Sequence, residues 1–197
     1  KRKSMLSYKE SLKILKETNA LLEGHFVLSS GLHSEKYVQC AKLLSKPEKA
    51  KKLCLSLAEK IKEKHKNIDL ILSPAIGGIV IGYEIGRILN IETIFAERTN
   101  GIFNLRRGFE IKKGQKTLIV EDVITTGKSS LECSSLAKKM GAEVLGYACI
   151  IDRSNGKSNI NKEIVSQVEI EIPTYTEENL PKHLEKIKPI KPGSRNL

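Results

Sequence analysis

Short apolar runs and helical apolar faces follow one another through the middle of the chain. Four runs have the length and β-branched content of buried strands, at 69–73, 91–97, 117–121 and 143–152. Helical segments at 79–89 and 128–140 lie between successive strands of this set. This alternation predicts an α/β fold, with a mostly parallel sheet flanked by helices.

Two further helices are predicted nearer the start of the chain. Ser7 with Glu10 and Ser45 with Glu48 have the spacing of a capping box, in which each side chain caps the other residue's backbone N–H. The first predicted helix covers 8–24. The second has an apolar face with helical periodicity, formed by Ala50, Leu53, Cys54, Leu57, Ala58 and Ile61.

The segment between these helices has a different pattern. Residues 24–40 read GHFVLSSGLHSEKYVQC, with strand-like stretches around a Ser-Ser-Gly turn. We therefore expect a small hairpin outside the main core, at about 20–40, within a single domain over 1–197. The end of the chain, 188–197, is rich in Pro and Lys, a composition typical of poorly ordered termini.

Composition and charge narrow the range of partners. The chain has 197 residues and a net charge of +11, and it contains no apolar run near the ~20 residues that span a bilayer. Its lysines are spread over predicted helix faces, and no basic–aromatic motif typical of RNA-binding sheets occurs. We therefore expect neither a membrane nor a nucleic acid as partner.

The cysteines bear on the compartment. Cys40, Cys54, Cys133 and Cys149 form no C-x-x-C pair, and none lies near a His at metal-ligand spacing. Free thiols in a reducing compartment are the simplest interpretation. The sequence therefore predicts a cytoplasmic protein without a zinc site.

The clearest chemical signal is the stretch VEDVITTGKSS at 120–130. A predicted strand ends here in two acids, and small hydroxyl residues with Gly127 lead into a helix. In a parallel sheet this is the edge where ligands bind, and the free N–H groups of a helix N-terminus favour a phosphate. Gly127 lets the backbone approach the anion, and Thr and Ser hydroxyls add donors.

A Walker A loop is the main competing interpretation, since Gly127-Lys128-Ser129 matches the last positions of that motif. The motif needs a Gly where Asp122 stands. A carboxylate there repels the phosphates of a nucleoside triphosphate, so we reject this interpretation. A sugar phosphate fits better, because Glu121 and Asp122 can accept hydrogen bonds from ribose hydroxyls and support a Mg²⁺ through water.

VEDVITTGKSS resembles the phosphoribosyl-pyrophosphate (PRPP) motif of the type I phosphoribosyltransferases. GHFVLSSGLHSEKYVQ resembles the N-terminal hood of the orotate-specific members, and SPAIGGIVIGYEIGR, FAERTNGIFNLRRGFEI and KPGSR are similar to other segments of the same members. The resemblance implies that orotate and PRPP are converted to orotidine 5′-monophosphate and diphosphate in pyrimidine (UMP) biosynthesis. It also implies Mg²⁺ as cofactor and a homodimer.

The resemblance implies a role for each matching residue. Glu121 and Asp122 are the expected catalytic carboxylates. The residues expected to bind PRPP are Glu121, Asp122, Val123, Ile124, Thr125, Thr126, Gly127, Lys128, Ser129, Arg98, Gly77 and Gly78. Many relatives carry a Lys beside Gly77, so here the diphosphate is expected to rely on backbone N–H groups and Mg²⁺. No residue is expected to bind the metal directly; Mg²⁺ enters with PRPP and water near the two acids.

Four residues are expected to contact orotate, namely Thr125, Arg153, Phe26 and Tyr37. Arg153 matches the family's orotate-binding Arg, and its planar fork suits a carboxylate or a carbonyl pair. Taken without the resemblance, Arg153 reads as a surface residue after a strand. Plain core packing is an open alternative for Phe26.

The predicted hairpin departs from the family at one position. Many relatives place a Lys where Ser29 stands, so a direct charge contact is lost there. Ser29 and Ser30 are left as hydrogen-bond donors to the base. His25 and His33 are expected to be turn residues rather than catalysts.

Residues 98–115 match the family's mobile catalytic loop, which closes over the diphosphate, often from the neighbouring subunit. Arg106 and Arg107 are the catalytic candidates in this loop. Guanidinium groups stabilise a leaving diphosphate but do not readily donate protons, so we expect electrostatic rather than acid catalysis. Alternating apolar residues from Phe103 to Ile111 leave a structural β-ribbon as an alternative.

Two other functions remain open from the residues alone. A phosphoribosyltransferase for a purine base shares the phosphate loop and is expected to differ in the hood and at Arg153. A non-enzymatic, PRPP-sensing regulator of the same fold could use the net charge of +11 to bind nucleic acid. The intact acidic pair and phosphate loop argue against the regulator.

Overall fold

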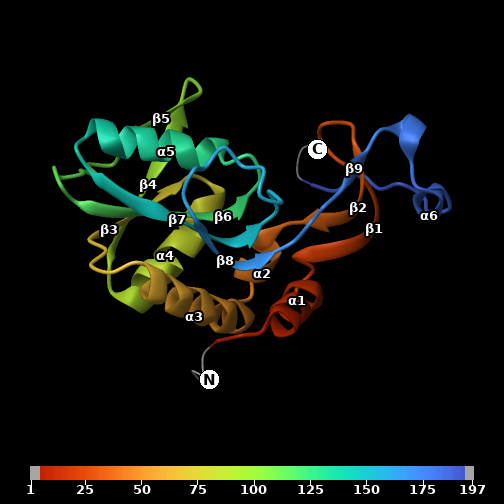
Figure 1. Cartoon of the computed structure of the whole chain (residues 1–197), viewed down its shortest axis with the longest axis horizontal. Coiled ribbons are helices and arrows are strands. Elements are labelled where there is room, and N and C mark those ends of the chain that lie inside the picture. The colour runs from red at the N-terminus through yellow and green to blue at the C-terminus, as the bar shows by residue number, and fades with distance from the viewer. Residues whose placement is uncertain (1–4, 194–197) are drawn as a thin grey trace.

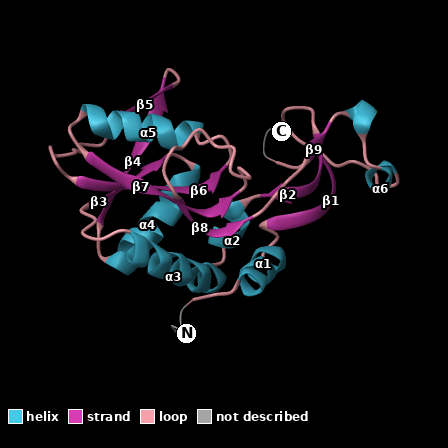
Figure 2. Ribbon diagram, in the orientation of Figure 1, coloured by secondary structure: helices cyan, strands magenta, loops and turns pink. Residues whose placement is uncertain are grey.

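The computed structural model describes residues 5–193. Figure 1 shows a large α/β body and a smaller β-rich lobe beside it, and Figure 2 separates their helices and strands. The elements are α1 (Tyr8–Glu17), β1 (Leu21–Val27), β2 (His33–Val38), α2 (Cys40–Leu44), α3 (Pro47–Lys64), β3 (Leu70–Pro74), α4 (Gly77–Leu89), β4 (Glu92–Thr99), β5 (Ile102–Leu105), β6 (Lys116–Ile124), α5 (Lys128–Lys139), β7 (Glu143–Asp152), β8 (Ile164–Glu169), β9 (Thr174–Tyr175), the 3-10 helix η1 (Glu177–Asn179) and α6 (Lys182–Glu185).

The body contains a six-stranded sheet in the order β5-β4-β3-β6-β7-β8. Every neighbouring pair from β4 to β8 is parallel, and only β5 runs antiparallel. Helices α3 and α4 cover one face and α5 covers the other, with a separate apolar core on each side (Figure 2). The predicted α/β fold is confirmed, and the central strands and helices begin and end close to the predicted residues.

The two predicted capping boxes have different outcomes. Ser7 and Glu10 form the first, but α1 ends at Glu17 rather than near residue 24, because Asn19 turns the chain with φ 60° and the strand β1 follows at once. The second is wrong: the N-cap of α3 is Lys46, with no side-chain hydrogen bond. The apolar face predicted for α3 is buried at all six positions.

The predicted hairpin is confirmed as β1 and β2, which pair antiparallel. The short strand β9, not predicted, pairs with β2 and completes a three-stranded hood sheet. The expectation that His25 and His33 lie in turns is wrong. Both are buried strand residues, and they can be buried because their ring nitrogens hydrogen-bond to each other and to a backbone carbonyl.

Residues 188–193, the described part of the end that was expected to be poorly ordered, pair with the hood instead. Residues 187–193, here called the C-terminal strap, lie beside β1. The N–H of Ile190 donates to the carbonyl of His25 at 2.9 Å, and the N–H of Val27 donates to the carbonyl of Ile190 at 2.9 Å. Backbone pairing with a free strand edge thus overrides the local composition. Ser194 and Arg195, the last letters of KPGSR, lie outside the described residues.

The segment 98–115 begins as a β-ribbon. β4 runs on to Thr99, and β5 pairs antiparallel with it, from Thr99 with Ile102 to Ala96 with Leu105. The rest of the segment to Gln115 consists of turns and irregular chain. The mobility assigned to this loop stays a prediction.

Among the described residues, no helix combines the length and apolar character that crossing a membrane requires.

Candidate functional site

Two strand-to-helix turns meet at the carboxyl edge of the parallel sheet. β3 and β6 are neighbours, and their turns lead into α4 and α5. The turn after β6 surrounds a cavity of 160 Å³ lined by Glu121, Val123, Ile124, Thr125, Thr126, Gly127, Lys128, Ser129 and Ser130. A concave loop at a helix N-terminus is an anion-binding geometry. The structure therefore brings the residues predicted to hold a phosphate into one small cavity.

Gly127 is the N-cap of α5 and has a left-handed backbone with φ 84°. A Cβ atom at this position would lie 2.8 Å from Cγ1 of Ile160, closer than real Cβ contacts allow. The residue must therefore be Gly for two independent reasons, conformation and space. At the start of α5 the N–H of Lys128 donates to Thr126 Oγ1 at 3.3 Å, and both residues line the cavity.

Glu121 is buried at the carboxyl end of β6, with 8% of its surface exposed. Its Oε1 accepts a hydrogen bond from the backbone N–H of Asp122 at 3.0 Å. Burial raises the pKa of Glu121 to about 9, and the neighbouring Asp122 side chain adds to the rise. The site therefore holds a carboxyl group that keeps its proton far above the usual range.

Asp122 lies against the start of α4. Its Oδ1 accepts from the N–H of Val123 at 2.8 Å. A Cβ atom on Gly77 would lie 3.0 Å from both carboxylate oxygens of Asp122, and one on Gly78 would lie 3.1 Å from the carbonyl oxygen of Val120. Glycines let the α4 turn pack this closely on β6, with Gly77 against Asp122 and Gly78 against Val120. Their contact with PRPP stays a prediction.

A second cavity, of 510 Å³, lies between the hood and the body. Its lining residues are Val27, Leu28, Ser29, Ser30, Gly31, Tyr37, Gln39, Arg153, Lys191, Pro192 and Gly193. The backbone N–H of Arg153 donates to the carbonyl of Ile124 at 2.9 Å. Since Ile124 lines the phosphate cavity and Arg153 lines the second one, the two cavities are adjacent.

Arg153 and Tyr37 face this second cavity, whereas Phe26 does not. Burial lowers the pKa of Arg153, and its Nε is buried without a hydrogen-bond partner among the described residues. The hydroxyl of Tyr37 donates to Gln39 Oε1 at 2.8 Å. Phe26 is 4% exposed and packs on the Tyr37 ring, with 5.8 Å between ring centroids. Its predicted contact with a ligand remains untested, and its packing is that of a core residue.

The loop arginines line neither cavity in the single chain. Arg107 forms a bidentate pair with Glu97, with Nε–Oε2 at 2.8 Å and Nη2–Oε1 at 2.9 Å. Arg98 pairs with Glu132 at 2.6 Å and lies 4.1 Å from the centroid of the Phe103 ring. The predicted roles of these arginines therefore require a loop movement or a second subunit.

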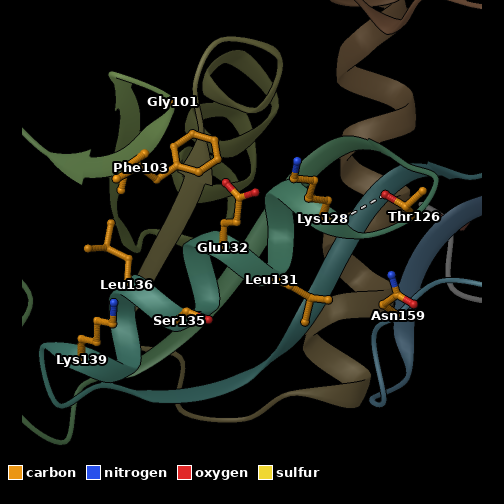
Figure 3. A pocket seen from close by; sticks show the side chains of 11 residues that line it. Gly101, Phe103, Thr126, Lys128, Leu131, Glu132, Ser135, Leu136, Lys139 and Asn159 are labelled. Carbon is orange, nitrogen blue, oxygen red and sulfur yellow. Dashed lines mark hydrogen bonds between the residues drawn. The ribbon is translucent and has the colours of Figure 1, made fainter. Parts of the chain in front are cut away.

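A larger cavity of 730 Å³ lies on the outer side of α5, next to the phosphate loop. Figure 3 shows Thr126, Lys128 and Asn159 at one end of it, and Lys139 at the other. Its wall is mainly apolar, from Phe103, Leu131 and Leu136. Asn159 joins this wall to the loop, because its N–H donates to the carbonyl of Thr126 at 2.9 Å.

The binding of Mg²⁺ near the acidic pair stays a prediction. Among the described residues, no group of three or more His, Cys, Asp or Glu side chains is placed to hold a metal ion. Mg²⁺ usually keeps several waters and is bound through one or two carboxylates together with substrate phosphates. The Asp122 carboxylate fits that pattern, whereas Glu121 in its protonated form supplies no second carboxylate.

Sequence reasoning missed the residues that the C-terminal strap brings to the second cavity, namely Lys191, Pro192 and Gly193. A Cβ on Gly193 would lie 3.2 Å from the hydroxyl oxygen of Tyr37. The signal was present, since KPGSR was among the segments that carried the resemblance. The contact between these residues and the hairpin could not be predicted from local sequence, because they come more than 150 positions after the hairpin.

Comparison with known proteins supports the same interpretation. Residues 42–186 match the family model of the phosphoribosyl transferase domain. The chain is 47% identical over 189 residues to the orotate phosphoribosyltransferase of Parvibaculum lavamentivorans, covering 94% of this chain and 97% of that protein. It is also 47% identical over 184 residues to the orotate phosphoribosyltransferase of Caldicellulosiruptor bescii, covering 93% and 96%.

Solved structures share the fold at lower identity. The orotate phosphoribosyltransferase of Aeropyrum pernix superposes with a TM-score of 0.70 at 23% identity, covering 80% of this chain and 92% of that one. The adenine phosphoribosyltransferase of Thermoanaerobacter pseudethanolicus superposes with a TM-score of 0.57 at 18% identity, covering 68% and 88%. The fold alone therefore does not separate an orotate enzyme from a purine enzyme, whereas the relatives at 47% identity do.

Proposed function

This chain belongs to the orotate phosphoribosyltransferase family, and from that premise we propose how its residues carry out the reaction. The enzyme joins orotate to PRPP and releases diphosphate, a step of pyrimidine biosynthesis. One observation carries the proposal for the site. A phosphate-sized cavity at the start of α5 adjoins a larger cationic cavity under the hood. The acidic pair lies near the carboxyl end of β6, the strand that leads into α5.

The 160 Å³ cavity is the proposed site of the 5′-phosphate of PRPP. Its backbone N–H groups and hydroxyls suit a dianion, and the left-handed Gly127 keeps side-chain atoms out of the approach. Glu121 and Asp122 are the proposed acceptors for the ribose hydroxyls. The carboxylate of Asp122 at the strand end also places negative charge where the sugar ring becomes positive as its bond to diphosphate breaks.

The 510 Å³ cavity is the proposed orotate site. Orotate carries a carboxylate and two ring carbonyls, and the cavity offers the Arg153 guanidinium, two Ser hydroxyls and the Tyr37 hydroxyl. The unpartnered Nε of Arg153 supports this assignment, because a buried donor without a partner is costly until a ligand satisfies it. The ring nitrogen of orotate then attacks the anomeric carbon from the hood side.

The diphosphate is proposed to leave over the α4 turn. Gly77 and Gly78 form the first turn of α4 there, and the first backbone N–H groups of a helix have no partner within the helix. Mg²⁺, when bound with PRPP, neutralises the charge of the departing diphosphate. Arg106 and Arg107 are proposed to add positive charge from the loop 98–115, and closure of that loop is proposed to keep water from the activated sugar.

We propose that the enzyme is a homodimer in which this loop acts across the interface. Ile76, Val80 and Tyr83 are 87%, 53% and 66% exposed, and they form one apolar stripe at the start of α4. A second copy of the chain is the occupant that we propose for the stripe, because the loop arginines reach neither cavity within one chain.

A cytoplasmic location is proposed because Cys40, Cys54, Cys133 and Cys149 are free and buried.

Loss of orotate absorbance in the presence of PRPP and Mg²⁺ tests the proposed function. We expect turnover with orotate and none with adenine, hypoxanthine or xanthine under the same conditions. Consumption of a purine base without consumption of orotate would reject the assignment. Salt-dependent binding of DNA or RNA without any turnover would instead favour the regulator.

A further inference from the structure

The C-terminal strap forms one wall of the base cavity and is tied to the hood by its backbone. Phe26 and Ile190 form a parallel bridge, with hydrogen bonds on both sides of Ile190. β1 is an edge strand of the hood sheet, so the strap covers its free edge. Lys191, Pro192 and Gly193 follow this bridge directly and line the cavity. The position of Lys191 is therefore set by strand pairing.

A buried histidine pair fixes the beginning of the strap. His25 Nδ1 lies 2.7 Å from the carbonyl oxygen of Ile187, and because a carbonyl only accepts, His25 donates this bond. His25 Nε2 lies 2.6 Å from His33 Nδ1, so in the neutral pair His33 is the donor. The two rings are 2% and 7% exposed. Both strands of the hairpin thus hold the strap at its first residue.

Lys191 contributes positive charge to a cavity that has few charged side chains. Among the described lining residues, Arg153 and Lys191 are the only cationic side chains, and no carboxylate is present. The part of the hairpin that faces the cavity contributes Ser29, Ser30 and Gly31, which carry no charge. Half of the positive charge around the base therefore comes from the end of the chain.

We propose that Lys191 is a specificity-determining residue, whose ammonium group acts with Arg153 on the carboxylate of orotate. The inference rests on the proposed function. A charge-assisted contact strengthens binding of a base that carries a carboxylate and leaves a base without one unaffected. Lys191 thus selects orotate over uracil, which has the same ring without the carboxylate, and takes no part in binding PRPP.

The test compares Lys191→Met with Lys188→Met, a matched variant of an exposed strap lysine that lines neither cavity. We expect Lys191→Met to raise the KM for orotate about tenfold, with the KM for PRPP and kcat within about twofold of wild type. The inhibition constant of uracil against orotate should stay unchanged. Lys191→Arg should restore most of the orotate affinity, and Lys188→Met should behave as wild type.

The outcomes separate this inference from the function on which it rests. An active wild-type enzyme whose KM for orotate is unchanged in Lys191→Met would overturn the inference alone. Equal weakening of orotate and uracil would also overturn it, because that result indicates a general packing role for the strap. A wild-type enzyme that turns over PRPP only with purine bases would overturn both.

Discussion

At the scale of single residues, the site combines a carboxyl group that resists ionisation with a glycine that both backbone conformation and limited space favour. Glu121 owes its raised pKa mainly to burial at the strand end, and Gly127 owes its identity to a left-handed turn packed against Ile160. Both features cost stability in the folded protein. Costly features gathered at one edge of a sheet are typical of a functional site.

Glu121 makes stability depend on pH in a defined direction. Its pKa is about 9 in the folded protein against an ordinary value of 4.5, so the folded state holds a proton that the unfolded state releases. The contribution of Glu121 to stability is thus retained below about pH 4.5 and is lost progressively as pH rises to about 9. Glu121→Gln removes this ionisation. The Tm of the variant minus the Tm of wild type should therefore increase from about pH 4.5 to about pH 9.

Differential scanning calorimetry without ligand measures the effect. Glu143→Gln, which removes an exposed acid at the opposite end of the neighbouring strand β7, is the control and should give a constant offset. If the curves of Tm against pH for Glu121→Gln and wild type run parallel from pH 5 to 9, the raised pKa is wrong.

Gly127→Ala should damage both stability and PRPP binding. The new Cβ atom must displace Ile160 while the backbone keeps φ 84°, at a cost of roughly 1–3 kcal/mol in the free energy of unfolding. Distortion of the loop should raise the KM for PRPP at least about tenfold. Denaturant unfolding and steady-state kinetics measure the two effects.

Gly156→Ala is the matched control, since Gly156 has φ 70° and a Cβ atom added there would meet nothing within 4 Å beyond its neighbours in the chain. Only the left-handed backbone should then lower the free energy of unfolding, by about 1 kcal/mol, and the KM for PRPP should equal that of wild type. Equal KM values for both variants would show that the space around Gly127 has no role in the phosphate site.

At the scale of elements, the sequence predicted the sheet body well and the chain ends poorly. Continuous apolar runs such as 117–121 have few alternatives to a buried strand, so the core of β6 was predicted, although the strand continues to Ile124. β8 was missed because IVSQVE carries polar residues that its edge position tolerates. β9 and the strap are ordered only by pairing with residues far away in sequence, a contact that no local pattern encodes.

The candidate site shows the same division. The phosphate loop and the acidic pair are contiguous, so their cavity could be predicted from 120–130 alone. The base cavity is assembled from three distant segments, the hairpin, Arg153 and the strap, and only the first two were assigned a role in binding the base. Within the hairpin, strand alternation and a bulge between Glu23 and Phe26 decide which side chains line the second cavity, and local sequence does not show that bulge.

The loop 98–115 gives a prediction at this scale. In the free enzyme Arg107 is held by Glu97, and the proposed reaction needs its guanidinium near the diphosphate. Arg107→Ala should lower kcat about 100-fold, because one charge that stabilises the transition state is lost, while the affinity for PRPP falls little. Pre-steady-state kinetics and calorimetric titration with PRPP separate the two quantities.

Lys112→Ala is the control for this loop. It removes an exposed cation from the same segment, at a position to which no catalytic role is assigned. It should retain more than half of the wild-type kcat. Equal losses in both variants would point to the net charge of the loop, and full activity of Arg107→Ala would remove Arg107 from the mechanism.

At the scale of the whole molecule, the proposed dimer links the apolar stripe on α4 to catalysis. Val80→Lys with Tyr83→Lys places two charges on the stripe and should convert the protein to a monomer with little activity, since each site then lacks its partner's loop. Light scattering gives the mass and the orotate assay gives the activity. Tyr8→Lys, which changes a 56% exposed aromatic on α1, should leave both unchanged. A fully active monomer would show that the loop acts within its own chain.

The measurement that bears most directly on the whole account is calorimetric titration of the enzyme with PRPP in the presence of Mg²⁺. Asp122→Asn keeps the shape of the side chain and removes its charge, so we expect the Kd for PRPP to rise about 10- to 100-fold, as for the loss of hydrogen bonds to a charged acceptor. Glu143→Gln should bind as wild type does. An unchanged Kd in Asp122→Asn would contradict the claim that the acidic pair and the adjoining loop hold the sugar phosphate.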